Sequence, residues 1–588
     1  MKELQYLNKY FIKYKYRFLI GLLITIVAQI FSLFTPELIG NSIQVIEDYV
    51  KSEHKEVANL KQELLKNILY ILATTIIAGF FTFLMRQTLI VMSRYVEFDL
   101  KNEIFNHYQN LSQHFYIRNR TGDLMNRISE DVGKVRMYVG PAVMYSLNTI
   151  MRFTIVVIYM YNISPKLTLY SLLPLPLLSY SIFKISSEIH KKSGAFQKNL
   201  SNLFSFTQEI FSGIRVIKAY AIEGKKQNNF FDLSQESNRK AMDLAKVNSL
   251  FGPLMILLIG LSNLVVVYVG GSMYMNNDPE IESIGVIAQF ILYINMLTWP
   301  VASLGWVSSL VQEAEASQKR INEFLKETPK IKNPTEVSTK IKGAIVFENV
   351  SFEYEDTHIK ALTGISFSLE KGKTLAILGK TGSGKSTILS LISRLYDVNH
   401  GQITIDGQPI TTVNLYDLRN QISVVPQDAF LFSDSIKNNI KFGNENAKDE
   451  AVIEAAKLAV VHDNIMLFNE QYETVLGERG ITLSGGQKQR VSIARALIKN
   501  APILLLDDCL SAVDTETEEI ILNNLLAYCK DKTTLIVSHR VSSAKNADEI
   551  LVLEEGKIIE KGTHSELLAL NGYYKELYVK QLSEKEIN

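Results

Sequence analysis

The fold of the second half of the chain is decided by the stretch GKTGSGKS at residues 379–386. It fits the pattern G-x-x-x-x-G-K-[ST] of a phosphate-binding loop, whose glycines let backbone N–H groups converge on phosphate oxygens. A strand-like run, TLAIL, precedes the loop and a helix-like run, TILSLISRLY, follows it, which is the context that this motif requires. Both flanks argue against a merely flexible glycine turn. The stretch therefore predicts a site for the phosphates of ATP at a helix N-terminus.

The loop and the residue after it provide most of the predicted ATP contacts. They are Gly379, Lys380, Thr381, Gly382, Ser383, Gly384, Lys385, Ser386 and Thr387. We expect the Lys385 ammonium to reach the β- and γ-phosphates and the Ser386 hydroxyl to bind Mg²⁺.

A second motif ends in an acid that suits the same site. The apolar run ILLLD at residues 503–507 predicts a strand with Asp507 at its tip, where the carboxylate can hold Mg²⁺ directly or through water. Alone this pattern is weak, because buried strands often end in aspartate. It is strong about 120 residues after a phosphate-binding loop. ATP and Mg²⁺ are thus the predicted ligands.

A third motif is LSGGQ at residues 483–487, directly before the helix-like run KQRVSIARALI. Small polar residues and glycines at a helix N-terminus can hold an anion, although the segment alone would be only a helix cap. The candidate contacts are Ser484, Gly485, Gly486 and Gln487.

Strand-like and helix-like runs alternate from about residue 343 onward. The strand-like runs are TLAILG, QISVVPQ, PILLLD and TTLIVSH. Their alternation with helices predicts an α/β nucleotide-binding domain with a largely parallel sheet over residues 343–588. A polar segment with two prolines, residues 321–342, predicts a linker before it.

The first half contains long, almost uncharged apolar runs instead. A helix of roughly 20 apolar residues crosses a hydrocarbon core of about 30 Å. Segments of this length lie near residues 17–38, 67–90, 139–162, 166–187, 247–275 and 283–311. Buried helices of one large soluble core are the alternative, which the length of the runs disfavours. We predict an α-helical six-span membrane domain over residues 1–320, with long cytoplasmic helical extensions.

Basic residues indicate the orientation of these spans. Lys and Arg gather in the N-terminal tail and in the connections after the second and fourth spans. The positive-inside rule then places both termini and these two connections in the cytoplasm. The N-terminal run lacks a small-residue cleavage site, so we interpret it as a retained helix. We expect a multi-pass protein of a bacterial inner membrane, in contact with the lipid bilayer.

Composition excludes several other classes of function. The formal net charge of +1 gives no bulk attraction to nucleic acid, and we expect no nucleic-acid partner. The two cysteines, Cys509 and Cys529, lie among motifs that need cytosolic ATP, so we expect reduced thiols. No clustered His/Cys spacing suggests a metal site beyond the nucleotide's magnesium.

GKTGSGKS, LSGGQ and ILLLD follow six spans in this order along the chain. Together they resemble the ATP-binding cassette (ABC) family, and the arrangement looks like an ABC exporter half-transporter. The resemblance covers essentially the whole chain. It implies that Tyr354 stacks on adenine, that Gln427 contacts Mg²⁺ and communicates with the membrane domain, and that His539 contacts the γ-phosphate. It also implies coupling helices near residues 115–121 and 212–219 that dock on cassettes.

The resemblance further implies a dimer. Two cassettes of this family pack head to tail, and LSGGQ of one completes the ATP site of the other. One chain holds one cassette, so a second half-transporter chain is the expected partner. The expected activity is ATP-hydrolysis-driven export of amphipathic or lipid-like small molecules by alternating access. A peptide exporter and an ATP-gated channel or regulatory subunit are the alternatives.

Asp508 departs from the pattern of the family, which has glutamate at this position as the base for the attacking water. Aspartate is one methylene shorter, so its carboxylate falls on the order of 1 Å short, and such a misplacement can cost roughly 100-fold in rate. Either Asp508 acts through a small backbone adjustment, or this chain's own site hydrolyses slowly beside a competent partner. We favour the second case, a heterodimer, over a homodimer. With Asp508, the predicted catalytic residues are Lys385, Gln427 and His539.

Two arginines, Arg86 and Arg152, lie within predicted spans. Charged residues there are costly and are usually functional or paired. We interpret both as snorkelling toward the inner interface.

Overall fold

The computed structural model describes residues 2–51, 57–511 and 513–587, and it divides into two compact units. The helical unit comprises Met1–Gln109 and Gly122–Glu327. The α/β unit comprises Asn110–Thr121 and Thr328–Asn588. The short segment 110–121 therefore makes its contacts with the second unit although it lies within the first half of the sequence.

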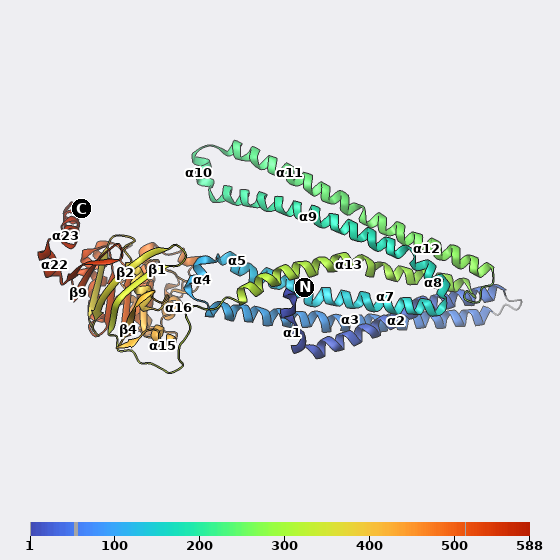
Figure 1. The fold of residues 1–588 in the computed structure, drawn as a ribbon, viewed down its shortest axis with the longest axis horizontal. Helices are drawn as coiled ribbons and strands as arrows, with labels where there is room; N and C mark the ends of the chain where they lie inside the picture. The colour runs from blue at the N-terminus through green and yellow to red at the C-terminus, as the bar shows by residue number, and fades with distance from the viewer. Residues whose placement is uncertain (1, 52–56, 512, 588) are drawn as a thin grey trace. The chain divides into compact units, whose positions relative to one another are not determined.

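Long helices build the helical unit (Figure 1). They are α2 (Lys15–Lys51), α3 (Val57–Asn110), α7 (Val143–Ile163), α9 (Pro174–Ser212), α11 (Glu223–Ser249), α12 (Phe251–Met275) and α13 (Ile284–Leu325). The shorter helices are η1 (Glu3–Leu7), α1 (Asn8–Lys13), α5 (Thr121–Asn126), η2 (Arg127–Asp131), α6 (Val132–Met137), η3 (Tyr138–Ala142), α8 (Pro165–Leu172) and α10 (Ile214–Ala219). Within the described part of the chain, six helical stretches are long and apolar enough to cross a membrane, which confirms the six-span prediction.

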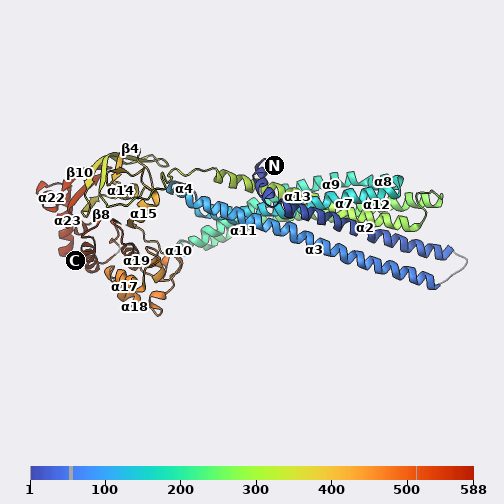
Figure 2. The same cartoon turned by 90° about the horizontal axis from the view of Figure 1, so that it is seen from below.

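These helices continue well beyond the predicted spans. Helix α3 has 54 residues and so extends about 80 Å at 1.5 Å per residue, more than twice the thickness of a hydrocarbon core. Figure 2 shows α3 as a long continuous rod, and Figure 1 shows the same for the pair α9 and α11. Helix α8 ends at Leu172 and α9 begins at Pro174, because proline cannot donate the backbone hydrogen bond that a continuous helix would need.

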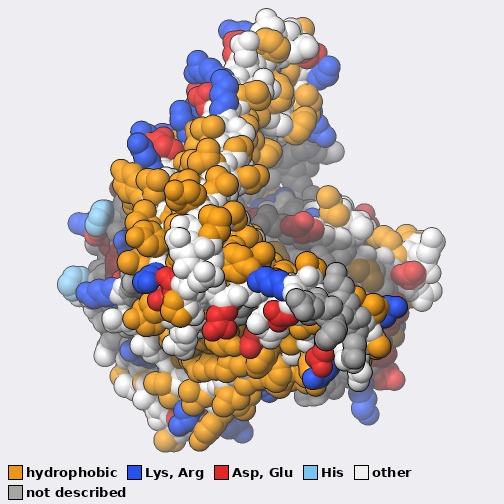
Figure 3. Space-filling model, turned by 90° about the vertical axis from the view of Figure 1, so that its right-hand side faces the viewer, with side chains coloured by type: hydrophobic (Ala, Val, Ile, Leu, Met, Phe, Trp, Pro, Cys, Tyr) orange, Lys and Arg blue, Asp and Glu red, His pale blue; other side chains and the backbone are white. Residues whose placement is uncertain are grey.

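The outer faces of the helical unit are apolar. Hydrophobic side chains cover much of the face visible in Figure 3. Tyr268 on α12 and Ile256, three turns before it, are 80% and 75% exposed. Such a surface would be costly in water and suits a lipid environment.

Inside the bundle, helices α2 and α13 approach closely at two glycines. A Cβ atom added to Gly285 would lie 2.2 Å from the carbonyl oxygen of Gly40, so only glycine fits there. Buried Phe290 and Tyr293 of α13 pack with Val156 of α7 in the adjoining apolar core. The structure thus gives this part of the bundle an apolar core as well as an apolar exterior.

The α/β unit contains two sheets. The antiparallel sheet has the order β2-β1-β4-β5, and the larger sheet has the order β10-β9-β3-β8-β7-β6. The strands are β1 (Ile345–Tyr354), β2 (Ile359–Leu369), β3 (Thr374–Gly379), β4 (His400–Ile405), β5 (Gln408–Pro409), β6 (Ile422–Val425), β7 (Ile503–Asp507), β8 (Thr533–Val537), β9 (Glu549–Glu554) and β10 (Lys557–Gly562). Strands β9, β3, β8, β7 and β6 pair in parallel, whereas β10 pairs antiparallel with β9. The predicted α/β domain with a largely parallel sheet is confirmed.

Helices surround the sheets and divide the apolar core. They are α4 (Gln113–Arg118), α14 (Lys385–Ile392), α15 (Leu415–Asn420), α16 (Ile436–Lys441), α17 (Asp449–Leu458), α18 (His462–Met466), η4 (Gln471–Glu473), η5 (Glu478–Gly480), α19 (Gly485–Ile498), α20 (Thr515–Tyr528), α21 (Val541–Ala544), α22 (His564–Leu570) and α23 (Tyr573–Ile587). One core cluster lies between the two sheets and α14, and another lies among α16, α17, α19 and α20.

Candidate ATP site

Parallel pairing brings the predicted site residues to one edge of the larger sheet. The strands β3, β8, β7 and β6 all run the same way, so their carboxyl ends lie together. Val537 is paired with Ile377 on one side and with Asp507 on the other, which places His539 between the phosphate loop and the acids. Ligands of open α/β sheets bind at this edge.

The phosphate loop is crowded where its backbone turns. Gly379 has φ +151°, and an added Cβ atom would lie 2.2 Å from the carbonyl oxygen of Leu553. Gly384 has φ +97°, and an added Cβ atom would lie 2.3 Å from the carbonyl oxygen of Ala361. Glycine is therefore required at both positions, both by backbone conformation and by space.

Lys385 is held inside this loop. Its side-chain Nζ donates hydrogen bonds of 2.8 Å to the carbonyl oxygens of Gly379 and Lys380, and the residue is only 6% exposed. Burial lowers the pKa of the Lys385 ammonium to about 8, although the nearby Asp508 and Asp507 carboxylates act in the opposite direction. Among the described residues no carboxylate bonds to this buried ammonium, which is therefore well prepared to meet phosphate oxygens.

A buried hydroxyl in the same loop supports this interpretation. Ser383 is 4% exposed, and its Oγ atom has no hydrogen-bond partner among the described residues. Buried polar atoms usually have partners, so an unpaired one marks a place where a ligand can supply the missing bond. The glycine cradle and the Ser383 hydroxyl both fit a nucleotide phosphate chain.

Ser386 and Asp507 lie together, as the sequence predicts for a magnesium site. Ser386 Oγ donates a hydrogen bond of 2.9 Å to Asp507 Oδ1. Burial raises the pKa of the Asp507 carboxyl, and the hydrogen bond from Ser386 partly opposes that shift. A hydroxyl and a carboxylate are the hard oxygen ligands that Mg²⁺ prefers, so this pair fits the ion. Gln427 follows the neighbouring strand β6 and is exposed.

Tyr354 and Thr387 connect the antiparallel sheet with the phosphate loop. Tyr354 ends β1, and its hydroxyl lies 3.0 Å from Thr387 Oγ1 in the first turn of α14. The ring of Tyr354 packs edge-on against Tyr396, with a centroid distance of 5.5 Å. The aromatic side chain that we expect to stack on adenine therefore lies beside the phosphate loop.

Asp508 has an unusual backbone. Its φ is +41°, in the left-handed region, which aspartate tolerates better than most residues. Its N–H donates to the carbonyl oxygen of Val537 at 2.8 Å, and its own carbonyl oxygen accepts a hydrogen bond of 3.0 Å from Ser511 Oγ. The backbone that carries the predicted base is thus tied to strand β8, next to His539.

The signature segment, residues 483–487, lies at the N-terminus of α19. The Ser484 N–H donates to Gln487 Oε1 at 2.9 Å, and the Gln487 N–H donates to Ser484 Oγ at 3.3 Å, which forms a capping box. Ser484 and Gly485 are exposed. Among the residues that the structure describes, no hydrogen bond joins this segment to the phosphate loop of the same chain.

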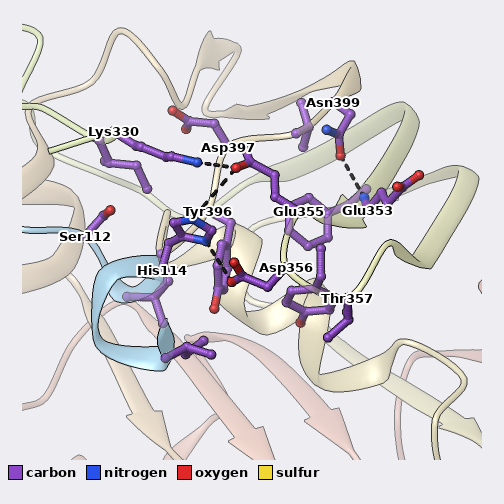
Figure 4. Close-up of a pocket in the computed structure, with 16 residues that line it drawn as sticks. Ser112, His114, Lys330, Glu353, Glu355, Asp356, Thr357, Tyr396, Asp397 and Asn399 are labelled. Atoms are coloured by element: carbon purple, nitrogen blue, oxygen red, sulfur yellow. Dashed lines mark hydrogen bonds and ion pairs between the residues drawn. The ribbon is translucent and has the colours of Figure 1, made fainter. Parts of the chain in front are cut away.

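The segment 110–121 includes one of the expected coupling helices, near residues 115–121, and it contacts Asp356 close to Tyr354. His114 Nδ1 lies 3.1 Å from Asp356 Oδ2, and Arg118 Nε lies 3.2 Å from Asp356 Oδ1. Figure 4 shows His114 pointing into a cavity of about 370 Å³ that Tyr354 and Tyr396 also line. The partners are more than 200 residues apart in sequence, so no spacing pattern could have signalled them.

An acidic residue of this cavity, Glu355, also pairs with the linker. Lys330 forms an ion pair and a hydrogen bond with Glu355. The hydrogen bond from Lys330 lowers the pKa of the Glu355 carboxyl. Helix α4, the linker and the end of β1 therefore meet around one cavity beside the predicted adenine contact.

Comparisons with known proteins agree with this architecture. Residues 18–301 match the family model described as the ABC transporter transmembrane region, and residues 362–511 match the model described as ABC transporter. The chain is 35% identical to the multidrug resistance-like ATP-binding protein MdlA of Escherichia coli, over 100% of this chain and 98% of that protein. It is also 35% identical to an ATP-dependent lipid A-core flippase of Syntrophus aciditrophicus, over 83% of this chain and 81% of the flippase.

A solved structure has the same fold. A bacterial Atm1-family ABC exporter with ATP bound matches with a TM-score of 0.78 and 26% sequence identity, over 96% of this chain and 98% of that one. Relatives of this similarity along the full length, together with both family models, establish membership. The chain is an integral multi-pass membrane protein of the ABC transporter family, an exporter half-transporter whose cassette is an ATPase coupled to transport.

Proposed function

We propose that the chain exports amphipathic or lipid-like small molecules by alternating access, as one half of a dimer. The observation that carries the dimer is the separation of the two nucleotide-binding motifs. The phosphate loop, Ser386 and Asp507 lie together, whereas Ser484 and Gly485 are exposed at another helix. A second cassette facing the first would bring its own signature segment to this chain's phosphate loop.

Residues of the proposed site divide the chemistry of hydrolysis. Lys385 and the loop N–H groups hold the phosphates, and the Tyr354 ring stacks on the adenine of ATP. Asp508 accepts the proton of the attacking water, and His539 contacts the γ-phosphate. Ser386, Asp507 and Gln427 would hold Mg²⁺, which neutralises charge on the phosphate oxygens when it is bound.

Exposed apolar residues at α10 supply a docking element for the partner. Phe211, Val216 and Tyr220, at and beside this short helix, are 70%, 57% and 74% exposed. They lie at the turn between α9 and α11, where the sequence predicts a coupling helix. An apolar tip on a polar helical hairpin needs a covering surface.

A groove of the α/β unit has the chemistry to cover such a tip. A cavity of about 460 Å³ is lined by Val424, Phe442 and Arg495. The Arg495 guanidinium lies 5.4 Å from the ring centre of Phe442, and burial lowers its pKa to about 10. We propose that α10 of one chain docks in this groove of the other, so that closure of the cassettes moves the membrane helices.

Polar groups inside the helical unit favour an amphipathic substrate. Arg152 Nε donates a hydrogen bond of 2.7 Å to Gln29 Oε1, and Gln29 also donates to Asn148. The structure thus differs from the snorkelling interpretation of Arg152, because the side chain turns toward α2 within the bundle, whereas Arg86 is exposed. A guanidinium in an apolar bundle attracts an anionic or strongly polar headgroup.

A cavity of the helical unit has a mixed lining. It measures about 490 Å³ between α9 and α13 and is lined by Ile182, Phe183, Ser186, His190 and Gln312. Apolar side chains together with hydroxyl, imidazole and amide groups suit a molecule with a tail and a headgroup. This lining supports the amphipathic class over a peptide of arbitrary sequence.

The short carboxylate of Asp508 supports a heterodimer over a homodimer. Its N–H and carbonyl oxygen are both hydrogen-bonded, which limits the backbone adjustment that would extend its reach. We propose that this chain's site binds ATP and hydrolyses it slowly, while its signature segment completes the site of a more active partner. In this proposal the chain lies in a bacterial inner membrane, and both of its termini are on the cytoplasmic side.

Transport in proteoliposomes tests the proposal. Fluorescently labelled phosphatidylglycerol would be followed as its ATP-dependent movement between leaflets, with the purified chain alone and with candidate partner chains. We expect movement against a gradient that Lys385→Ala abolishes and Arg152→Ala reduces, while the exposed-lysine control Lys371→Ala and the exposed-arginine control Arg86→Ala retain it. ATP-gated movement that only dissipates a gradient would instead identify a channel.

A further inference from the structure

The connection that carries His539 is held by a side chain from the far C-terminus. His539 lies between β8 and α21. Gln581 Nε2 donates a hydrogen bond of 2.8 Å to the carbonyl oxygen of His539, and the Val541 N–H donates one of 2.8 Å to Gln581 Oε1. One amide therefore bridges the backbone on both sides of Arg540, which fixes the local turn.

Gln581 belongs to a helix that is firmly attached to the α/β unit. Tyr574, Tyr578 and Gln581 are spaced i, i+4 and i+7, so they share one face of α23. Tyr574 is fully buried in an apolar cluster with Val541 and Ala544 of α21. Packing thus keeps α23 beside the turn that Gln581 holds.

The beginning of α23 has its own anchors. The backbone N–H groups of Tyr573 and Tyr574 donate to the Glu560 carboxylate at 2.5 and 3.0 Å. The Tyr574 hydroxyl lies 2.6 Å from His564 Nδ1. Since Gln581 lies only two turns farther along the helix, these contacts limit how far its amide can move.

A second anchor holds the next residue of the turn. Glu518 of α20 is 2% exposed and pairs with the Arg540 guanidinium. It also accepts hydrogen bonds from Ser542 Oγ at 3.0 Å and from Ser543 Oγ at 3.3 Å. Arg540 and the start of α21 are thus fixed from one side, while Gln581 fixes the backbone of His539 from the other.

We propose that Gln581 is a positioning residue that sets the place of His539 toward the γ-phosphate, which makes helix α23 a part of the hydrolytic switch. The inference rests on the proposed role of His539. A side chain must lie within a few tenths of an ångström of its working position, since a displacement of about 1 Å can cost roughly 100-fold in rate. Without the Gln581 amide, the carbonyl oxygen of His539 loses a hydrogen bond that does not depend on Glu518.

Steady-state hydrolysis at this chain's own ATP site, in the assembled full-length transporter with the partner's ATP site inactivated, tests the proposal. In Gln581→Met, which keeps the length and removes both hydrogen bonds, we expect kcat to fall about tenfold and KM for ATP to change less than about twofold, because the phosphate loop and Tyr354 are untouched. We expect the same changes in kcat and in KM for ATP in Gln581→Ala. The matched control is Lys580→Ala at the neighbouring exposed position of α23, which should leave both constants unchanged.

A double variant separates positioning from general stability. If Gln581 acts through His539, then Gln581→Met combined with His539→Ala should be no slower than His539→Ala alone, whereas independent effects would multiply. Multiplied effects, or an unchanged kcat in Gln581→Met, would overturn the inference. An unchanged kcat in His539→Ala would instead overturn the proposed role of His539 itself.

Amide hydrogen exchange gives a readout that needs no activity. The Val541 N–H is bonded to Gln581, so Gln581→Met should raise its exchange rate about tenfold or more, and Lys580→Ala should not. Exchange at Val541 that stays at the original rate in Gln581→Met would show that the amide does not hold the turn.

Discussion

The phosphate loop and the signature segment are both short, glycine-rich stretches at the start of a helix, and the space around Gly379 and Gly384 differs from the space around Gly485. Added Cβ atoms at Gly379 and Gly384 would meet carbonyl oxygens within 2.3 Å. An added Cβ atom at Gly485 would meet no atom of the described residues within 4 Å. The first stretch is shaped by its own chain, whereas the second leaves room for a molecule from outside.

The phosphate loop is a preformed binding site, whereas the signature segment is one half of a site. In the phosphate loop a lysine is buried and a hydroxyl is unpaired, so the chain alone prepares phosphate contacts. In the signature segment Ser484 and Gln487 satisfy each other's backbone groups, so the chain alone requires no ligand there. The open surface becomes meaningful only against a second cassette.

The largest expected effect is a difference in ATP binding between two variants, each of which adds one methyl group to one of the two stretches. Gly384→Ala should weaken ATP binding about 100-fold or more, because its Cβ atom would lie 2.3 Å from a carbonyl oxygen at a φ that alanine avoids. Gly485→Ala should leave ATP binding by the single chain within about twofold, while it lowers hydrolysis by the dimer. Titration with a fluorescent ATP analogue measures the first quantity. Equal losses of binding in both variants would contradict the comparison.

The next largest effect concerns pH and Lys385. Only the ammonium form attracts phosphate, and its pKa in the nucleotide-free protein is about 8. ATP affinity should therefore fall by up to about tenfold between pH 7 and 9, where an ordinary lysine with a pKa near 10.4 would stay charged. Lys385→Arg is the control, because its charge does not titrate in this range. A pH-independent affinity of the original chain would refute the role of this buried ammonium.

The same lysine should make stability depend on pH with the opposite sign. Its folded-state pKa lies below its unfolded value, so the unfolded chain binds more protons between about pH 8 and 10.4. The Lys385 contribution to the free energy of unfolding should therefore rise with pH across this window. Thermal unfolding without nucleotide, compared between the original chain and Lys385→Met, isolates this contribution. A difference between the two that stays constant with pH would argue against a depressed pKa.

A several-fold effect is expected from lengthening the base. Asp508→Glu should raise hydrolysis about three- to tenfold if the short carboxylate limits the rate, because the added methylene restores about 1 Å of reach. The measurement is the rate of the chain assembled with its partner, with Asp508→Asn as the control that keeps the length and removes the base. If Asp508→Glu is slower than the original, the left-handed backbone at φ +41° already suits aspartate, and the homodimer gains support.

The smallest effect on ATP turnover should come from the contact between α4 and Asp356. Asp356→Asn removes the carboxylate that pairs with His114 and Arg118. The Arg118 side chain is 64% exposed, and ion pairs open to solvent are weak, so hydrolysis should change less than about twofold. Substrate moved per ATP hydrolysed should fall more than the hydrolysis rate, which parallel flux and phosphate assays would reveal. Glu353→Gln, which removes a carboxylate of the preceding strand β1, is the control.

Local patterns made much of the fold and the site predictable. Apolar length alone identified the spans, because a bilayer demands it, and the GKTGSGKS pattern located the loop because its chemistry needs those residues at that spacing. Pairing of Ser386 with Asp507 followed from motif order and from the common edge of parallel strands.

Contacts between distant segments were not predictable. The pairs His114 with Asp356, Gln581 with His539, and Arg152 with Gln29 depend on which helix packs where. A span containing arginine has the same sequence pattern whether the side chain turns toward lipid, interface or neighbour. For the same reason our snorkelling interpretation missed the inward contact of Arg152.

The assignment of residues 110–121 to the α/β unit has a consequence for swapping parts between relatives. A single cut at the linker would transplant a cassette without the twelve residues that His114 and Arg118 anchor to it. Chimeras of such exporters should therefore be joined at three places, so that the short insert travels with its cassette. Whether a foreign cassette is compatible would then depend on residues 110–121, which lie in the membrane half of the sequence.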